Sequence, residues 1–313
     1  MGPQLDKLHS EHLQNQSKKT SPGKLVQGAS QMKYGMNLLL WSGEIVEEHY
    51  PILEKLKEFG YGGVEVPIFN LELSIYEKLG RKLDELGLEC TAVTVRNEED
   101  NPISSDKAAR AAGVANNKLA LDCCAAMKAQ NLVGPYHSAI GVFSGSGPTE
   151  DEFKWGVDSM RQTAEYAATV GVTLGVEYLN RFECYFLTTI ADDVRFIQAV
   201  DHPSCKLMYD TFHANIEERS LGDAIRTAAP HLCHVHISEN DRSTPGVGHV
   251  AWKETFDTLK EIGYDGWMVV EAFGLSLPEL AAATKIWRRM YEGELQLAAD
   301  ALTFMKKEVA ARG

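Results

Sequence analysis

The feature that most constrains this chain is a regular alternation, after Met32, of short apolar runs with longer amphipathic runs. Such alternation is typical of repeated strand–helix units that build a parallel sheet covered by helices. We expect strands at residues 34–41, 63–67, 88–95, 131–136, 173–177, 206–210, 232–237 and 267–271. We expect helices near residues 45–59, 72–86, 106–129, 151–170, 189–200, 220–229, 252–262 and 278–291. Eight units of this kind are the number that closes a (β/α)8 barrel, the TIM barrel.

Glycines mark the ends of several expected helices, because glycine most readily adopts the left-handed conformation that closes a helix. The glycines in question are Gly60, Gly87, Gly171 and Gly263. The alternative fold, an open doubly wound sheet, would carry a G-x-G-x-x-G phosphate loop after its first strand, and no such motif follows residues 34–41. We therefore predict one barrel domain over residues 32–313. A last amphipathic stretch, residues 291–309, is expected to add a C-terminal helix.

The remaining parts of the sequence suggest an ordinary cytoplasmic protein. Residues 1–31 are polar and lack the apolar segment of a secretory signal, so we expect a disordered extension, with an expression remnant or an upstream start as the alternatives. No run of about 18 apolar residues is present, so we expect no membrane span. The six cysteines are scattered without a C-x-x-C pair, which indicates reduced thiols.

The net charge argues against one class of partner. The formal charge is −13 at pH 7, and no cluster of Lys and Arg appears. Because nucleic-acid binding depends on such clusters, we expect no nucleic-acid partner. A cation or a neutral polar substrate fits this composition better.

Four successive expected strands end in residues that can bind a metal. Functional groups of such barrels lie at the carboxyl ends of the strands, and there the chain has Glu177, Asp210, His236 and Glu271. A lone carboxylate after a strand is often a helix N-cap, and a lone buried histidine is often only hydrogen-bonded. Three converging carboxylates, however, repel one another unless a cation neutralises them. Oxygen-rich ligation with one imidazole suits Mn²⁺, Mg²⁺ or Co²⁺, so we predict a single divalent metal site.

The segments that follow these strands are rich in hydrogen-bonding side chains. Glu183 follows Glu177 by six residues, His213 follows Asp210 by three, and Arg242 follows His236 by six. Loops of this kind suit a polyhydroxylated ligand. A role in bracing the loops is the alternative for His213 and Arg242.

These segments resemble the D-tagatose 3-epimerase and D-allulose (psicose) 3-epimerase family, within the larger group of xylose-isomerase-like barrels. The matching stretches are GVEYLNRFE (175–183), MYDTFHANIEE (208–218), HVHISENDRSTPGVGHVAW (234–252) and VVEAF (269–273). The resemblance spans roughly residues 33–290. It is specific, because spacing and identity agree in all four segments.

The resemblance implies a role for each candidate residue. Glu177, Asp210, His236 and Glu271 match the family's metal ligands, and the two glutamates also match its acid/base pair. Glu183, His213 and Arg242 match its substrate-contacting positions. Mn²⁺ is the expected metal, with Co²⁺ and Mg²⁺ as alternatives, and a homodimer or homotetramer is the expected assembly.

The implied reaction is inversion at C3 of a free ketohexose or ketopentose of the D-tagatose, D-allulose/D-fructose or L-ribulose type. A proton leaves C3 to give a cis-enediolate and returns on the opposite face. An aldose–ketose isomerase of the same barrel group is the nearest alternative, and a non-catalytic sugar-binding protein is an alternative from another class. A metal-dependent DNA-repair nuclease is disfavoured, because it needs more histidines and a basic surface.

Two departures from the family pattern leave the identity of the sugar open. Residues 134–138 lack the tryptophan that some members have near this rim. Trp41, at the end of the first expected strand, either packs against a sugar or fills the mouth of the barrel.

Overall fold

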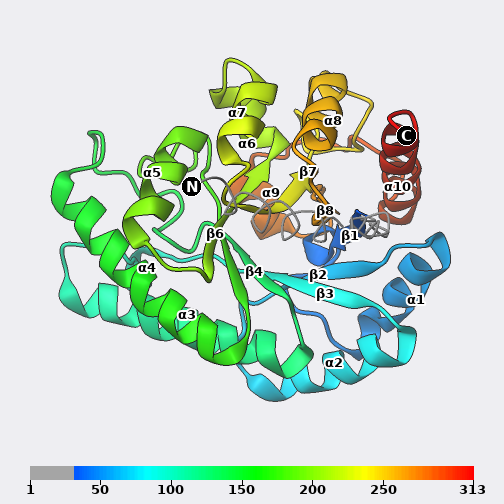
Figure 1. Cartoon of the computed structure of the whole chain (residues 1–313). Coiled ribbons are helices and arrows are strands. Elements are labelled where there is room, and N and C mark those ends of the chain that lie inside the picture. Colours follow the sequence, from blue (N-terminus) through cyan, green and yellow to red (C-terminus); the bar gives the residue numbers. More distant parts are fainter. Residues whose placement is uncertain (1–31) are drawn as a thin grey trace, which may run out of the picture. The chain divides into compact units, whose positions relative to one another are not determined.

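The computed structural model describes residues 32–313, so the prediction for residues 1–31 lies outside the described residues. Residues 32–313 form one compact unit around a closed barrel of parallel strands, β1 to β8 in chain order. The helices surround this barrel on its outside (Figure 1). The predicted TIM-barrel fold is confirmed, and the open-sheet alternative is excluded by the β1–β8 pairing, in which Lys33 lies beside Trp267.

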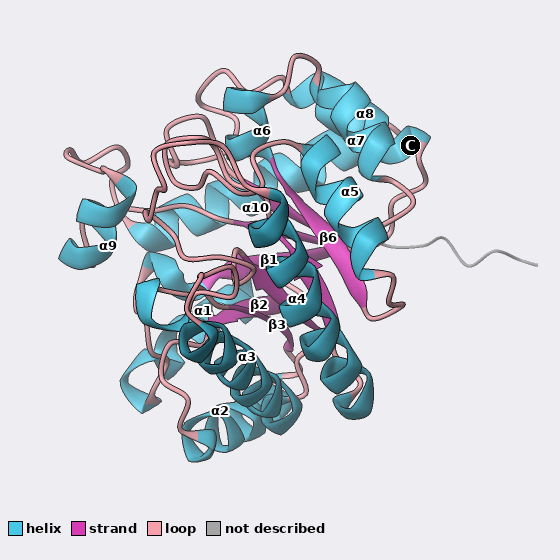
Figure 2. Cartoon of the chain, turned by 90° about the vertical axis from the view of Figure 1, so that its left-hand side faces the viewer, coloured by secondary structure: helices cyan, strands magenta, loops and turns pink. Residues whose placement is uncertain are grey.

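The strands are short and the helices are of varied length. The strands are β1 Lys33–Asn37, β2 Gly63–Pro67, β3 Glu89–Val93, β4 Asn131–Gly134, β5 Thr173–Val176, β6 Cys205–Asp210, β7 Leu232–Ile237 and β8 Trp267–Val270. The helices are α1 Tyr50–Phe59, α2 Leu73–Leu86, α3 Lys107–Met127, α4 Glu150–Val170, α5 Ile190–Val200, α6 Thr211–Glu217, α7 Leu221–Ala228, α8 Trp252–Glu261, α9 Pro278–Thr284 and α10 Glu294–Ala310. Three short 3-10 helices are η1 Leu38–Leu40, η2 Glu47–His49 and η3 Glu98–Asp100. Figure 2 shows the strands enclosed by this outer layer.

Glycine C-caps end several helices as predicted. Gly60, Gly87 and Gly171 have left-handed backbone conformations at the C-caps of α1, α2 and α4. Gly263 also has a positive φ and directly follows the C-cap of α8. Among residues 32–313, no helix has the length and apolar character needed to cross a membrane.

The first strand is shorter than predicted. β1 ends at Asn37, where a strand was expected to continue to residue 41, and Leu38–Leu40 form a 3-10 turn instead. The side-chain oxygen of Asn37 accepts the N–H of Leu39 at 2.8 Å and so caps this turn. As a result Trp41 is half-buried and packs against the hydrophobic core.

The assignment of the last helices also needs correction. The helix predicted at 278–291 ends at Thr284, and Lys285 closes it in a left-handed conformation. In α9 only Ala281 is buried, whereas α10 buries a continuous face that includes Leu297, Ala301 and Met305. α10 contacts α1, α8, β1 and β8. The predicted C-terminal helix therefore covers the seam between β8 and β1, because it has the broader apolar face.

One short helix, α6, was not predicted. It begins directly after β6, where the side chain of Asp210 caps it: Oδ1 accepts the N–H groups of Phe212 at 2.5 Å and His213 at 3.4 Å. Its seven residues are too few to give a clear periodic pattern. This cap orients Asp210 and brings His213 to the mouth of the barrel, meaning the carboxyl ends of the strands.

Asp193, in the first turn of α5, is fully buried, and neither carboxylate oxygen has a hydrogen-bond partner among residues 32–313. Burial raises the pKa of Asp193 well above its ordinary value, and the neighbouring Asp192 adds to the rise. A raised carboxyl pKa contributes stability that is complete below the unfolded pKa and is lost as pH rises through the folded pKa.

We therefore expect Asp193→Asn to become more stable relative to the parent as pH rises from about 5 to about 8, by at most about 1.4 kcal/mol per pH unit. Urea unfolding of both proteins across this range measures the difference. A difference in unfolding free energy that does not change with pH would contradict the expectation.

Candidate metal centre

The four predicted metal ligands lie at the same end of the barrel. Asp210 and His236 lie at the ends of β6 and β7, and Glu177 and Glu271 directly follow β5 and β8. The N–H of Glu177 donates to the carbonyl of Gly134 at 3.2 Å, so the strand ladder orients this glutamate. All four side chains are buried.

The ligand atoms surround a common point. Nδ1 of His236 lies 3.4 Å from Oδ2 of Asp210 and 3.4 Å from Oε1 of Glu271. Ligand atoms of Glu177, Asp210 and His236 all lie within 4.8 Å of one another. Atoms that are each about 2.1 Å from one cation are about 3.0 to 3.5 Å apart. Among residues 32–313, neither Oδ2 of Asp210 nor Nδ1 of His236 has a hydrogen-bond partner, so the site fits a divalent cation.

The electrostatics of this site also favour a cation. Burial, and then the charge of Glu271, raise the pKa of Glu177 well above its ordinary value. Burial raises the pKa of Glu271 to about 7. Burial thus disfavours the ionised form of both carboxylates more than the nearby His236 and Arg242 favour it. A divalent ion would supply a compensating charge and keep both carboxylates ionised.

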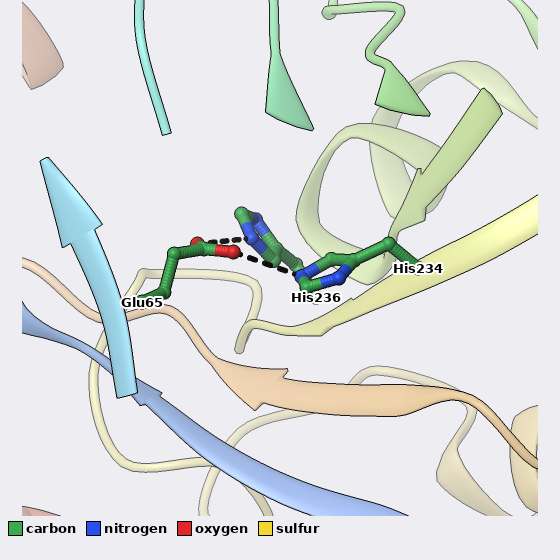
Figure 3. A group of neighbouring side chains, drawn as sticks. All are labelled: Glu65, His234 and His236. Atoms are coloured by element: carbon green, nitrogen blue, oxygen red, sulfur yellow. Dashed lines mark hydrogen bonds and ion pairs between the residues drawn. The ribbon is translucent and has the colours of Figure 1, made fainter. Parts of the chain in front are cut away.

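A second group of buried polar side chains, which the sequence analysis did not identify, lies beside His236. Figure 3 shows the carboxylate of Glu65, on β2, facing the imidazole rings of His234 and His236, with a dashed line from the carboxylate to each ring. Its Oε1 lies 2.7 Å from Nε2 of His236, and its Oε2 lies 2.9 Å from Nε2 of His234. All three side chains have an exposed fraction of 0%.

Two further side chains complete the surroundings of Glu65. Nδ2 of Asn37 donates to Oε1 of Glu65 at 3.0 Å, and the hydroxyl of Thr91 donates to Oε2 at 3.0 Å. Asn37 also lies 3.5 Å from Oε1 of Glu271. The sequence signal for this group was a charged residue in the centre of the apolar strand 63–67, and a histidine two residues before His236 on the same face of β7.

The three predicted substrate-contacting residues also come together, beside the metal ligands. Nη2 of Arg242 lies 3.0 Å from Nε2 of His213 and 3.5 Å from Oε1 of Glu183. Nε2 of His213 is in turn 3.7 Å from Oε1 of Glu177. We call Glu183, His213 and Arg242 the substrate group.

Arg242 is held by its loop and by two aromatic rings. Its guanidinium lies 4.0 Å from the ring centre of Phe212 and 4.8 Å from that of Phe273. Its φ of 59° is uncommon for a residue other than glycine. Its N–H donates to the carbonyl of Glu239 at 2.9 Å, which places Glu239 at the base of the loop.

Glu239, which the sequence analysis did not single out, organises this loop. Its fully buried carboxylate accepts the N–H groups of Gly246 at 2.8 Å and Val250 at 3.1 Å, and the indole N–H of Trp252 at 3.0 Å. One carboxylate therefore closes the segment that carries Arg242.

We expect Glu239→Gln to loosen this loop, because an amide nitrogen cannot accept a hydrogen bond and at least one of these buried N–H groups loses its partner, at a cost of about 1–3 kcal/mol. Hydrogen exchange of the backbone amides should become faster across residues 240–250. The matched control is Glu292→Gln at an exposed position. Unchanged exchange in the loop would exclude this role for Glu239.

Comparison with known proteins identifies the family. Residues 53–307 match the xylose isomerase-like TIM barrel family. The chain belongs to this family. The D-psicose 3-epimerase of Agrobacterium fabrum is 33% identical to it over 269 residues, which cover 84% of this chain and 92% of that protein.

Solved structures agree with this assignment. A D-psicose 3-epimerase from Clostridium cellulolyticum H10, with D-tagatose, has a TM-score of 0.83 and 29% identity, and covers 89% of this chain and 99% of its own. A D-allulose 3-epimerase from Methylomonas sp., in complex with D-allulose, has a TM-score of 0.83 and 27% identity, with coverages of 89% and 97%. The chain is thus a member of the ketose 3-epimerase family and an enzyme of the isomerase class.

Proposed function

We propose that this protein is a metal-dependent ketose 3-epimerase acting on a free ketohexose or ketopentose of the D-tagatose, D-allulose/D-fructose or L-ribulose type. The observation that carries the proposal is the pair of buried glutamates, Glu177 and Glu271, beside Asp210 and His236. Epimerisation needs one base to remove a proton and a second acid to return it on the other face. A pure binding protein has no need of such a pair.

The proposed cofactor is one divalent ion held by Glu177, Asp210, His236 and Glu271. We propose Mn²⁺, with Co²⁺ or Mg²⁺ as alternatives, because oxygen-rich ligation with one imidazole suits these ions. When bound, the ion supplies Lewis-acid polarisation of the ketone oxygen and the adjacent hydroxyl.

The two glutamates are the proposed acid/base pair. Glu177 follows β5 and Glu271 follows β8, so β6 and β7 separate them and they approach a common substrate from different sides. Each can keep one carboxylate oxygen for the proton at C3 while the other faces the ion. One removes the proton to give a cis-enediolate and the other returns it, and the roles exchange with the configuration of the substrate.

The substrate group provides a place for a sugar oxygen. Nδ1 of His213 accepts the backbone N–H of Asn180 at 3.0 Å, so in the neutral ring the proton is on Nε2. Burial lowers the pKa of His213 to about 4, which keeps the ring neutral near pH 7. Arg242 can only donate, so two donors 3.0 Å apart face each other. An oxygen of the O1–O3 end of a ketose would satisfy both donors.

The rest of the sugar has space nearby. A cavity of about 830 Å³ lies at the same end of the barrel and is lined by Leu39, by the segments after β2 and β3, and by α9. Leu39, in the cavity wall, and Phe273, which flanks Arg242, belong to one buried cluster, and none of the proposed metal ligands or substrate-group residues lines the cavity itself. Its mixed apolar and polar lining suits the carbon chain and hydroxyls of a sugar.

Two further features belong to the proposal. On the family resemblance we propose a homodimer or homotetramer. All six cysteines lie within the described residues and are free thiols, which supports the proposed cytoplasmic location.

The direct test is a panel of D-fructose, D-allulose, D-tagatose and L-ribulose, assayed with and without added Mn²⁺ after chelation, with products identified by NMR. We expect inversion at C3 that depends on the metal. An aldose product would favour the isomerase alternative. Sugar binding without exchange of the C3 proton in D₂O would favour a non-catalytic binder.

We expect Glu177→Gln and Glu271→Gln each to reduce turnover by about 10²-fold or more, because each removes one proton-transfer group. Steady-state rates on the best ketose of the panel measure the loss, and the metal content of each variant is determined in parallel. Near-normal turnover with an intact metal site would refute the assignment.

A further inference from the structure

We propose that Glu65 is a positioning residue of the metal centre: it fixes the tautomer and orientation of His236 so that Nδ1 faces the cation. The inference rests on the metal site of the proposed function. It concerns residues on β2 and β7, which are distant in sequence and meet only inside the closed barrel (Figure 3).

The two ring nitrogens of His236 differ in their distances to the neighbouring carboxylates. Nε2 lies 2.7 Å from Oε1 of Glu65, which is the length of a charge-assisted hydrogen bond and leaves no room for an ion between the atoms. Nδ1 lies 3.4 Å from both Asp210 and Glu271, too far for a good hydrogen bond but suited to atoms that share a cation. The ring therefore has a hydrogen-bonding side and a metal side.

The environment of Glu65 shows which side carries the proton. Its Oε1 is contacted by Asn37 and His236, and its Oε2 by Thr91 and His234. Asn37, Thr91 and His236 hydrogen-bond to the carboxylate, and Nε2 of His234 lies 2.9 Å from Oε2 without making a hydrogen bond. An ionised carboxylate only accepts, so Nε2 of His236 must donate. The remaining lone pair of the neutral imidazole is on Nδ1, the nitrogen that lies 3.4 Å from both Asp210 and Glu271.

The same hydrogen bonds argue against a second metal site formed by Glu65 and the two histidines. Glu65, His234 and His236 offer atoms close enough together to resemble a metal site of their own. Oε1 of Glu65 already accepts from Asn37 and His236 and Oε2 accepts from Thr91, and an Nε2 of His236 that donates a proton has no lone pair left for an ion. Glu65 instead acts through His236, as the carboxylates that orient metal-bound histidines generally do.

The first experiment measures metal affinity without any sugar. Chelated full-length Glu65→Gln is titrated with Mn²⁺, and the EPR signal of the free ion reports binding. We expect affinity to fall by about 10- to 100-fold, because the amide offers one acceptor oxygen in place of two. Asp193→Asn is the matched control, since it makes the same change at a fully buried carboxylate on α5, and its affinity should equal that of the parent.

Two results of this titration would overturn the proposal. One is an unchanged Mn²⁺ affinity in folded Glu65→Gln. The other is two ions bound per parent chain and one per Glu65→Gln chain, which would make Glu65 a ligand.

A second measurement uses the unmodified protein and tests the tautomer that the proposal requires, even if Glu65→Gln does not fold. Two-bond ¹H–¹⁵N NMR of histidine-labelled protein, loaded with Mg²⁺, reports which ring nitrogen carries hydrogen. The resonance of His236 is assigned by its loss in His236→Gln. We expect protonated Nε2 and unprotonated Nδ1, and the opposite tautomer would overturn the proposal.

Both readouts are independent of catalysis. If the ketose panel shows no epimerisation while metal affinity depends on Glu65, the proposed function fails and the positioning role stands. If epimerisation is present while Glu65→Gln binds Mn²⁺ like the parent, the positioning role fails alone.

Discussion

Burial of four carboxylates in and above the barrel is the constraint on which the rest of this site depends. Glu65, Glu177, Asp210 and Glu271 are all nearly or fully removed from water. An ionised carboxylate in such surroundings is costly unless hydrogen bonds or an opposite charge compensate it. Glu65 is compensated by hydrogen bonds from Asn37, Thr91 and His236. The other three carboxylates face a common point beside His236, where a divalent cation would compensate them together.

His236 connects these two kinds of compensation. One nitrogen of its ring faces a carboxylate held entirely by protein donors, and the other faces the ligands of the proposed ion. Because both sets of groups are carried by strands of a closed barrel, their separations are determined by the strand register rather than by mobile loops. This is the kind of rigid support that keeps a metal site ready for its ion.

In barrel enzymes the loops after the strands carry the part of the site that varies from one enzyme to another. Arg242 lies on a loop, but Glu239 closes that loop with buried hydrogen bonds, and Phe212 and Phe273 flank the guanidinium. These contacts hold Arg242 beside His213, which lies 3.7 Å from Glu177. Preorganisation of this kind reduces the ordering that substrate binding would otherwise require.

Much of this arrangement was predictable from the sequence, for a physical reason. Strand-end residues such as Glu177 and Asp210 stand out because a run of apolar residues ends in a charge, and the closed barrel brings such ends together. Glu65 did not stand out, since Val64-Glu65-Val66 has the same pattern as a strand with one face in water. Only barrel closure places it against His236, 171 residues away. Two features of the fold cannot be read from the spacing of apolar residues. The turn after Asn37 depends on a side-chain cap, and tertiary packing decides that α10 rather than α9 covers the seam between β8 and β1.

The most direct measurement is a crystal structure of the Mn²⁺-loaded protein, with the anomalous signal of manganese used to locate the ion. We expect one peak per chain, bound by Glu177, Asp210, Glu271 and Nδ1 of His236, with Glu65 outside the coordination sphere. A peak between Glu65, His234 and Nε2 of His236, or the absence of any peak at the mouth of the barrel, would contradict this expectation.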